Sequence, residues 1–241
     1  MKRIIRLAGT LYIILLGFTV AVCARDTESR PIRAGQASTA PNVPIWEAIL
    51  KEAGIDVVFS PLPPKRKRRS FVEGYLLLDC CHPPMYRDTP EEKATHLFTD
   101  PIYFAQAYYV FRKGEVVPIK DGSDLASLRV AGIRGFDYMW QDQFGDRIDG
   151  RDHTDILTLL EMHRADVGII TGLQFRFEMA KRRWPMELGN VMASGYLHAS
   201  VHVTRPDLLP KINAAIARMK ADGRMDKLLL LSEVATPMGA R

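Results

Sequence analysis

The chain has 241 residues, 47% of them hydrophobic, and a formal net charge of +5 at pH 7. This composition is typical of an ordinary globular protein, and the length allows one large core or two smaller ones. Without the three basic residues that precede residue 25, the net charge falls to +2. A net charge this small gives no reason to expect nucleic acid or a membrane surface as a partner.

Residues 1–24 have the pattern of a secretory signal peptide: a basic start, an apolar middle at 7–22 and a small residue, Ala24, at the expected cleavage site. The apolar run is short of the roughly 20 residues that a membrane-spanning helix needs, so we expect cleavage rather than anchoring. Lipidation at Cys23 is disfavoured because Val22 is larger than the residue that usually precedes a lipidated cysteine. We therefore expect a periplasmic mature protein that begins directly after Ala24.

The mature chain opens with alternating strands and helices. A strand over 31–37, an amphipathic helix over 45–53 and a second strand over 55–59 predict a right-handed crossover in a mostly parallel sheet. Ligands of such sheets bind beyond the carboxyl ends of the strands, which places Gln36 near a pocket mouth. Trp46, on the helix, is a candidate either for a wall of that pocket or for the core.

Five consecutive basic residues, Lys65 to Arg69, come next. Such a run can bind nucleic acid, but secretion argues against that use. A solvated helix face is the usual meaning of a charge run, and it is what we expect here.

Cys80 ends a predicted buried strand over 76–80, Cys81 follows it, and the mature chain has no other cysteine. In an oxidising compartment the two can pair with each other, pair between molecules or stay free. Adjacent Cα atoms lie about 3.8 Å apart, below the usual disulfide range, so a bond between them is the less expected state. A metal site is disfavoured because only His82 lies nearby. We expect Cys81 and His82 on the floor of a pocket.

The stretch TPEEKATHLFTDPIY, residues 89–103, begins with a helix start: a capping threonine, a proline and two acids. It is similar to the TPER…FS-x-PY signature of family 3 periplasmic solute-binding proteins, the binding components of polar amino acid uptake systems of the ABC type. The resemblance extends over roughly residues 32–231. The signature positions that match at the expected spacing are Thr89, Pro90, Glu91, Phe98, Pro101 and Tyr103.

Two positions depart from the family pattern. The family arginine that grips the ligand carboxylate stands where this chain has Glu92, and the aspartate that often binds the ligand ammonium stands where it has Thr171. There are two alternatives: Arg87 or another base takes the place of that arginine, or the ligand is not an α-amino acid. Arg87 is a candidate because arginine binds carboxylates through two hydrogen bonds. We expect weak or no binding of standard polar amino acids, and preference for another small polar or anionic solute.

A second α/β unit is predicted after a linker over 115–123. A strand over 129–133 is followed by a glycine and by a helix that opens at about Met139. Such a turn offers backbone N–H groups to an anion. The family holds its ligand from the second lobe with this turn, and the residues that the resemblance implies are Gly135, Phe136 and Tyr138. Further elements are expected over 155–164, 167–170, 197–204, 208–220 and 224–231, before a disordered tail.

Together with these elements, the resemblance implies a two-lobed α/β fold of the periplasmic-binding-protein type. Two hinge strands, around 107–112 and 197–204, join the lobes, and the ligand cleft lies between them. The first lobe is expected to comprise 25–111 and 203–241, and the second 112–202. Binding is expected to stabilise a closed arrangement of the lobes.

The resemblance implies a binding protein and not an enzyme: a monomer that captures a small-molecule ligand for an inner-membrane permease, with no cofactor, no metal and no nucleic acid. One alternative is an enzyme on the same scaffold, similar to cyclohexadienyl dehydratases, with Glu92, Asp137 or His82 as general acid. Another is a sensory module without a transporter. The predicted ligand-binding residues are Gln36, Trp46, Cys81, His82, Arg87, Tyr103, Gly135, Phe136, Tyr138 and Thr171.

Overall fold

The computed structural model describes residues 31–234, with side chains to residue 230; the predicted signal peptide and the tail beyond 234 lie outside them. The strands are β1 Ile32–Gly35, β2 Val57–Ser60, β3 Leu78–His82, β4 His96–Phe98, β5 Tyr103–Arg112, β6 Arg129–Ile133, β7 Asp146–Gly150, β8 Val167–Thr171 and β9 Met186–His202. The α-helices are α1 Asn42–Glu52, α2 Pro64–Val72, α3 Pro90–Thr95, α4 His153–Glu161, α5 Gly172–Lys181, α6 Leu209–Ala221 and α7 Arg224–Val234.

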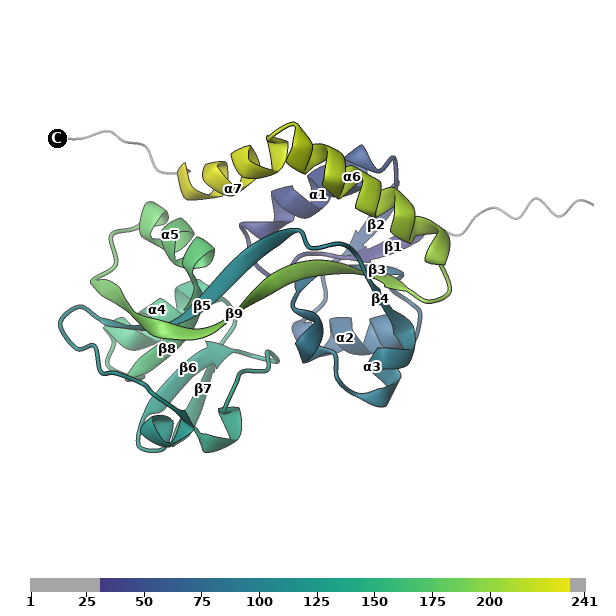
Figure 1. The fold of residues 1–241 in the computed structure, drawn as a ribbon. Coiled ribbons are helices and arrows are strands. Elements are labelled where there is room, and N and C mark those ends of the chain that lie inside the picture. The colour runs from purple at the N-terminus through teal and green to yellow at the C-terminus, as the bar shows by residue number, and fades with distance from the viewer. Residues whose placement is uncertain (1–30, 235–241) are drawn as a thin grey trace, which may run out of the picture. The chain divides into compact units, whose positions relative to one another are not determined.

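The strands form a sheet with the order β2-β1-β3-β9-β5-β8-β6-β7, and β4 pairs with β9 (Figure 1). We use "first lobe" for β1 to β4 with the end of β9 and the helices packed on them, and "second lobe" for β6 to β8 with α4 and α5. The protein thus has the predicted two-lobed α/β fold. No helix within 31–234 combines the length and apolar character that crossing a membrane requires.

The first lobe follows the predicted crossover. β1 pairs in parallel with β2 and with β3, as strand–helix–strand alternation requires. The apolar side of α1 buries Ile45, Trp46 and Ile49 in a core shared with α6. Trp46 is only 1% exposed, and its indole N–H donates to the carbonyl of Gly35 at 3.3 Å. This tryptophan therefore belongs to the core.

The second lobe departs from the prediction after β6. The prediction of a helix from Met139 is wrong. Trp140 has a left-handed backbone with φ of 59°, and only a three-residue 3₁₀ turn follows, at Gln141–Gln143. The chain then enters β7, which pairs in parallel with β6 over its whole length. The segment DRIDG of β7 has no apolar alternation, so pairing rather than local pattern makes it a strand. The helix α5 was also not predicted.

β5 and β9 connect the lobes. They pair antiparallel from Tyr103 opposite Leu197 to Arg112 opposite Met186, and they lie side by side in Figure 1. β9 runs for 17 residues and also pairs with β3 and β4, so one continuous strand passes through both lobes. The predicted hinge segment 107–112 lies on β5, and the segment 197–204 lies on β9 up to His202. The exact lobe boundaries stay a prediction.

Candidate functional site

A cavity of about 200 Å³ is lined by residues of both lobes. Gln36 and Trp46 do not line it: the side chain of Gln36 lies on the surface, and Trp46 is in the core. Binding of a ligand by the remaining residues stays a prediction. The predicted site residues that the structure brings together around this cavity are Cys81, His82, Arg87, Tyr103, Gly135, Phe136, Tyr138 and Thr171.

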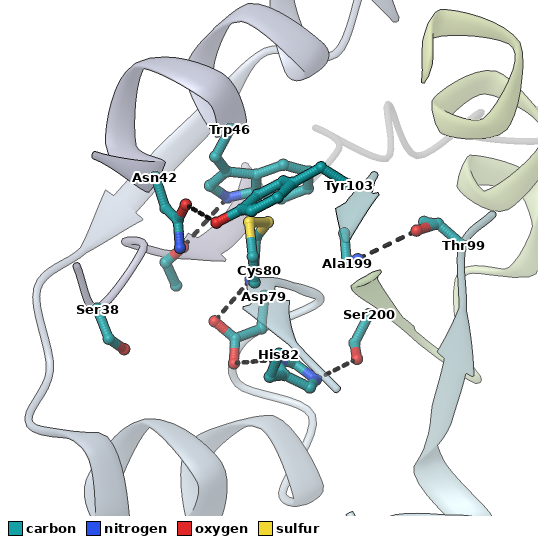
Figure 2. The surroundings of a disulfide bond; sticks show 12 residues. Ser38, Asn42, Trp46, Asp79, Cys80, His82, Thr99, Tyr103, Ala199 and Ser200 are labelled. Atoms are coloured by element: carbon teal, nitrogen blue, oxygen red, sulfur yellow. Dashed lines mark hydrogen bonds and ion pairs between the residues drawn. A yellow bond between two sulfur atoms is a disulfide. The ribbon is translucent and has the colours of Figure 1, made fainter. Parts of the chain in front are cut away.

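Cys80 and Cys81 form a disulfide bond, which the sequence had made the less expected state. Both cysteines line the cavity, and Figure 2 shows the ring of Tyr103 beside the disulfide. The Tyr103 hydroxyl donates to Oδ1 of Asn42 at 2.7 Å, and burial raises the pKa of this tyrosine. The disulfide and the aromatic ring give this part of the wall an apolar surface.

The basic run on α2 does not form the wholly solvated face that the sequence predicted. Arg66 and Arg69 are exposed, but Lys67 is only 4% exposed because it shares a helix face with the core residue Phe71. The Nζ atom of Lys67 lies 2.9 Å from the carboxylate of Asp79, which is itself 1% exposed. This buried charge is therefore matched by a buried countercharge.

Arg68, the next residue, points toward the cavity and is surrounded by acceptors. Its Nε and Nη2 atoms donate to the two carboxylate oxygens of Glu92 at 2.8 and 2.9 Å. Nη2 also donates to the carbonyl of Tyr86 at 3.1 Å, and Nη1 pairs with Asp137. The hydrogen bonds to Glu92 raise the pKa of Arg68. Burial alone would raise the pKa of Glu92, but the pairing of Glu92 with Arg68 outweighs burial, and the pKa of Glu92 is lowered. Glu92 therefore stays ionised and holds Arg68 in place.

Arg87 is buried but poorly matched. Its side chain is 9% exposed, and its nearest carboxylate oxygens, on Glu92 and Asp79, lie at 3.8 and 4.0 Å, beyond hydrogen-bond length. Nη1 donates to the carbonyl of Tyr86 at 3.1 Å, whereas the buried Nε has no partner within the part of the chain that the structure describes. Burial lowers the pKa of this arginine. A buried donor without an acceptor costs about 1–3 kcal/mol, so within the described residues Arg87 is the cavity-lining cation whose charge is least well paired.

The two histidines that line the cavity carry no charge at neutral pH. Burial and the neighbouring Arg87 charge hold the pKa of His82 well below its usual range, and Nε2 of His82 lies 2.9 Å from the Ser200 hydroxyl. Burial lowers the pKa of His153 to about 4. The electrostatics around the cavity are therefore set by lysine, arginine and carboxylate groups.

The second lobe contributes the loop that contains Gly135 and Tyr138. Gly135 has φ of +84°, and a Cβ atom there would lie 3.0 Å from Cγ of Lys65. The Tyr138 hydroxyl accepts the Ile133 N–H at 2.8 Å, which fixes the ring over the loop. Because no helix follows this loop, the predicted helix dipole cannot act on an anion here. The Thr171 hydroxyl accepts the Gln174 N–H at 3.2 Å and thereby caps α5.

Sequence reasoning missed the inward-facing residues Lys67 and Arg68, and the cavity residues Asn42 and His153. The spacing of Lys67 and Phe71, one helical turn apart, is the signal that would have placed the lysine on the buried face. Within 31–234, no group of three or more His, Cys, Asp or Glu side chains is arranged to hold a metal ion. The absence of a metal site in the whole chain stays a prediction.

The fold and the cavity between the lobes define a class, the two-lobed α/β proteins of the periplasmic-binding-protein type. The model of the bacterial extracellular solute-binding proteins, family 3, matches residues 41–230, and the chain belongs to this family. No curated protein matches it.

Solved structures support the fold. A mutant of ArgBP from T. maritima is 21% identical, with a TM-score of 0.68 and coverage of 84% of this chain and 95% of that one. The GluR0 ligand-binding core in complex with L-glutamate is 14% identical, with a TM-score of 0.70 and coverage of 85% and 98%. AncCDT-1, an ancestral amino acid-binding protein described as a precursor of cyclohexadienyl dehydratase, is 19% identical, with a TM-score of 0.64 and coverage of 83% and 94%.

Proposed function

We propose that the protein captures a small polar or anionic solute in the cavity between its lobes. The observation that carries this proposal is Arg87, a guanidinium that lines the cavity and whose nearest carboxylate oxygens lie 3.8 and 4.0 Å away. An oxygen of the ligand would accept a hydrogen bond from this guanidinium, and hydrogen bonds to charged donors are among the strong ones. The disulfide and Tyr103 would contact the apolar part of the ligand, as in most small-molecule sites.

The direct test is to identify what the protein carries. We expect mass spectrometry of protein purified without denaturation to detect a bound small molecule with a carboxylate or another oxygen-rich polar group. A ligand that lacks any hydrogen-bond acceptor would contradict the role of Arg87. Turnover of that ligand, rather than its unchanged release, would contradict a binding protein.

The neighbours in fold include structures with bound arginine or glutamate. We propose that this chain binds standard amino acids weakly or not at all. Glu92 is engaged by Arg68, and the Thr171 hydroxyl offers no charge to an ammonium group. An ammonium buried without a partner costs more than the roughly 1–3 kcal/mol of an unpaired neutral group, which corresponds to a loss of tenfold to over a hundredfold in affinity.

Calorimetric titration with the standard amino acids measures this selectivity. Micromolar or tighter binding of any of them by the wild type would contradict it. In the same assay, with the compound found by mass spectrometry, Arg87→Met should lose tenfold or more in affinity, because a charged hydrogen bond disappears while the side-chain length is kept. Arg66→Met removes an exposed arginine from α2 and should leave the affinity unchanged. Equal affinity of Arg87→Met and Arg66→Met would remove Arg87 from the site.

Closure of the lobes is the proposed mechanism of capture. β5 and β9 connect the lobes, and the cavity walls come from both sides of this connection. A ligand that contacts both walls favours the closed arrangement by its differential affinity. Small-angle scattering should therefore show a smaller radius of gyration when the identified compound is bound. Equal radii with and without it would exclude capture by closure.

The family and the signal pattern of residues 1–24 support a periplasmic monomer that serves an ABC-type inner-membrane permease. We favour binding over catalysis because Glu92 has a lowered pKa and His82 is neutral, so neither is a general acid near neutral pH. The fold shared with AncCDT-1 keeps the dehydratase alternative open to the same mass-spectrometric test.

A further inference from the structure

The two lobes approach each other closely where α2 of the first lobe meets the loop after β6 of the second. Arg68 on α2 pairs through Nη1 with the carboxylate of Asp137 on that loop. Beside this pair the backbones are close enough that a Cβ atom on Gly135 would lie 3.0 Å from Cγ and 3.3 Å from the backbone nitrogen of Lys65. An ion pair and a backbone contact therefore mark the same rim of the cavity.

Arg68 holds its two carboxylate partners differently. Glu92 lies on α3 of the same lobe and binds Nε and Nη2 at 2.8 and 2.9 Å, so this contact does not depend on the second lobe. Asp137 is the partner that separates from Arg68 when the lobes move apart. Arg68 then keeps Glu92, and Asp137, whose side chain is already 37% exposed, is hydrated by solvent. Because opening leaves no buried charge unpaired, the contact is reversible.

The remaining cations of the cavity do not have this arrangement. Lys67 is paired with Asp79 inside the first lobe, at 2.9 Å. Arg87 lies 3.8 Å or more from its nearest carboxylates, which also belong to the first lobe. In the part of the chain that the structure describes, Arg68 is thus the cavity-lining cation with an ion pair to the other lobe.

We propose that the pair of Arg68 and Asp137, here called the interlobe pair, stabilises the closed cavity from within the protein, with Glu92 as the residue that positions Arg68. The proposal deepens the proposed function, since it assumes capture by closure. It also restricts the ligand: Arg68 is occupied by Asp137, so the guanidinium open to the ligand is that of Arg87. A ligand with one acceptor group then suffices, because the protein itself supplies the charge contact between the lobes.

Asp137→Asn tests the interlobe pair without any ligand. Both proteins are freed of ligand by unfolding and refolding. We expect the Asp137→Asn variant to show a larger radius of gyration by small-angle scattering than the wild type. A partly exposed ion pair changes an equilibrium by roughly two- to fivefold, and the ratio of closed to open molecules should fall by that factor. Asp137→Glu keeps the charge and should restore the wild-type radius. Asp142→Asn, an exposed change five residues away, should have no effect.

Gly135→Ala is a second variant for the same rim. Alanine strains the loop at this φ of +84° in either arrangement, and in the closed one its methyl group would in addition meet Lys65, so the ligand-free radius should also increase. Circular dichroism and the midpoint of thermal unfolding would verify that each variant is folded. The proposed role of the interlobe pair is overturned if Asp137→Asn has the wild-type radius of gyration, or if the radius of Asp137→Glu is as large as that of Asp137→Asn. Either result leaves the proposed solute-binding function standing, since that function is tested separately by the co-purified compound.

Discussion

Replacing Lys67 by methionine should lower the free energy of unfolding by about 3–5 kcal/mol, the cost of breaking a buried ion pair from one side. The methionine fits the space of the aliphatic stem, but Asp79, 1% exposed, then loses the Nζ atom that lies 2.9 Å away, and its nearest arginine nitrogen, on Arg87, lies at 4.0 Å. The carbonyl of Gln36 and the hydroxyl of Ser38 lose their donor as well, at 3.2 and 2.8 Å. Urea unfolding of the wild type and the variant measures the difference.

Two variants separate the lost charge from lost packing. Arg66→Met removes the neighbouring exposed cation and should change the stability by less than about 0.5 kcal/mol. Adding Asp79→Asn to Lys67→Met removes the unpaired carboxylate and should recover part of the lost stability. If Lys67→Met is as stable as Arg66→Met, the lysine is not held by the buried pair.

Acid should destabilise the protein through His153 between about pH 6.5 and pH 4. Burial lowers the pKa of His153 to about 4 in the folded state, while an unfolded histidine keeps a pKa near 6.5. In this window the unfolded chain binds a proton that the folded chain does not, so stability falls as the pH falls. His153 alone should lower the free energy of unfolding by about 2–3 kcal/mol between pH 7 and pH 4.5. His96, whose pKa burial also lowers to about 4, adds to it.

Urea unfolding at a series of pH values tests this. His153→Gln cannot take up the proton, so its stability should depend less steeply on pH than that of the wild type, by about the amount assigned to His153. His163→Asn replaces an exposed histidine and should keep the wild-type slope. Identical slopes for His153→Gln and the wild type would show that His153 is not kept neutral by burial.

Local patterns were sufficient where the segment itself carries the signal, as a helix cap or as an apolar run. The capping threonine and proline at Thr89–Pro90 predicted α3, and the hydroxyl of Thr89 accepts the Glu92 N–H at 3.2 Å. The apolar run at Arg129–Ile133 predicted β6 with its exact bounds. Local rules failed at β7, because a polar segment became a strand only by pairing with β6. They also failed for residues 186–196, the first part of β9, whose partner β5 lies far away in the chain.

The sequence by itself determined the two-lobed α/β class, the family, and the departures at Glu92 and Thr171, because alternating elements and a spaced signature are read along the chain. Only the tertiary structure decided which charges meet. Lys67 and Asp79 are 12 positions apart, and Arg68 and Asp137 lie on different lobes, so no local spacing joins them. Burial then decides their roles: a charge out of water must find a partner, and the fold determines which partner is within reach.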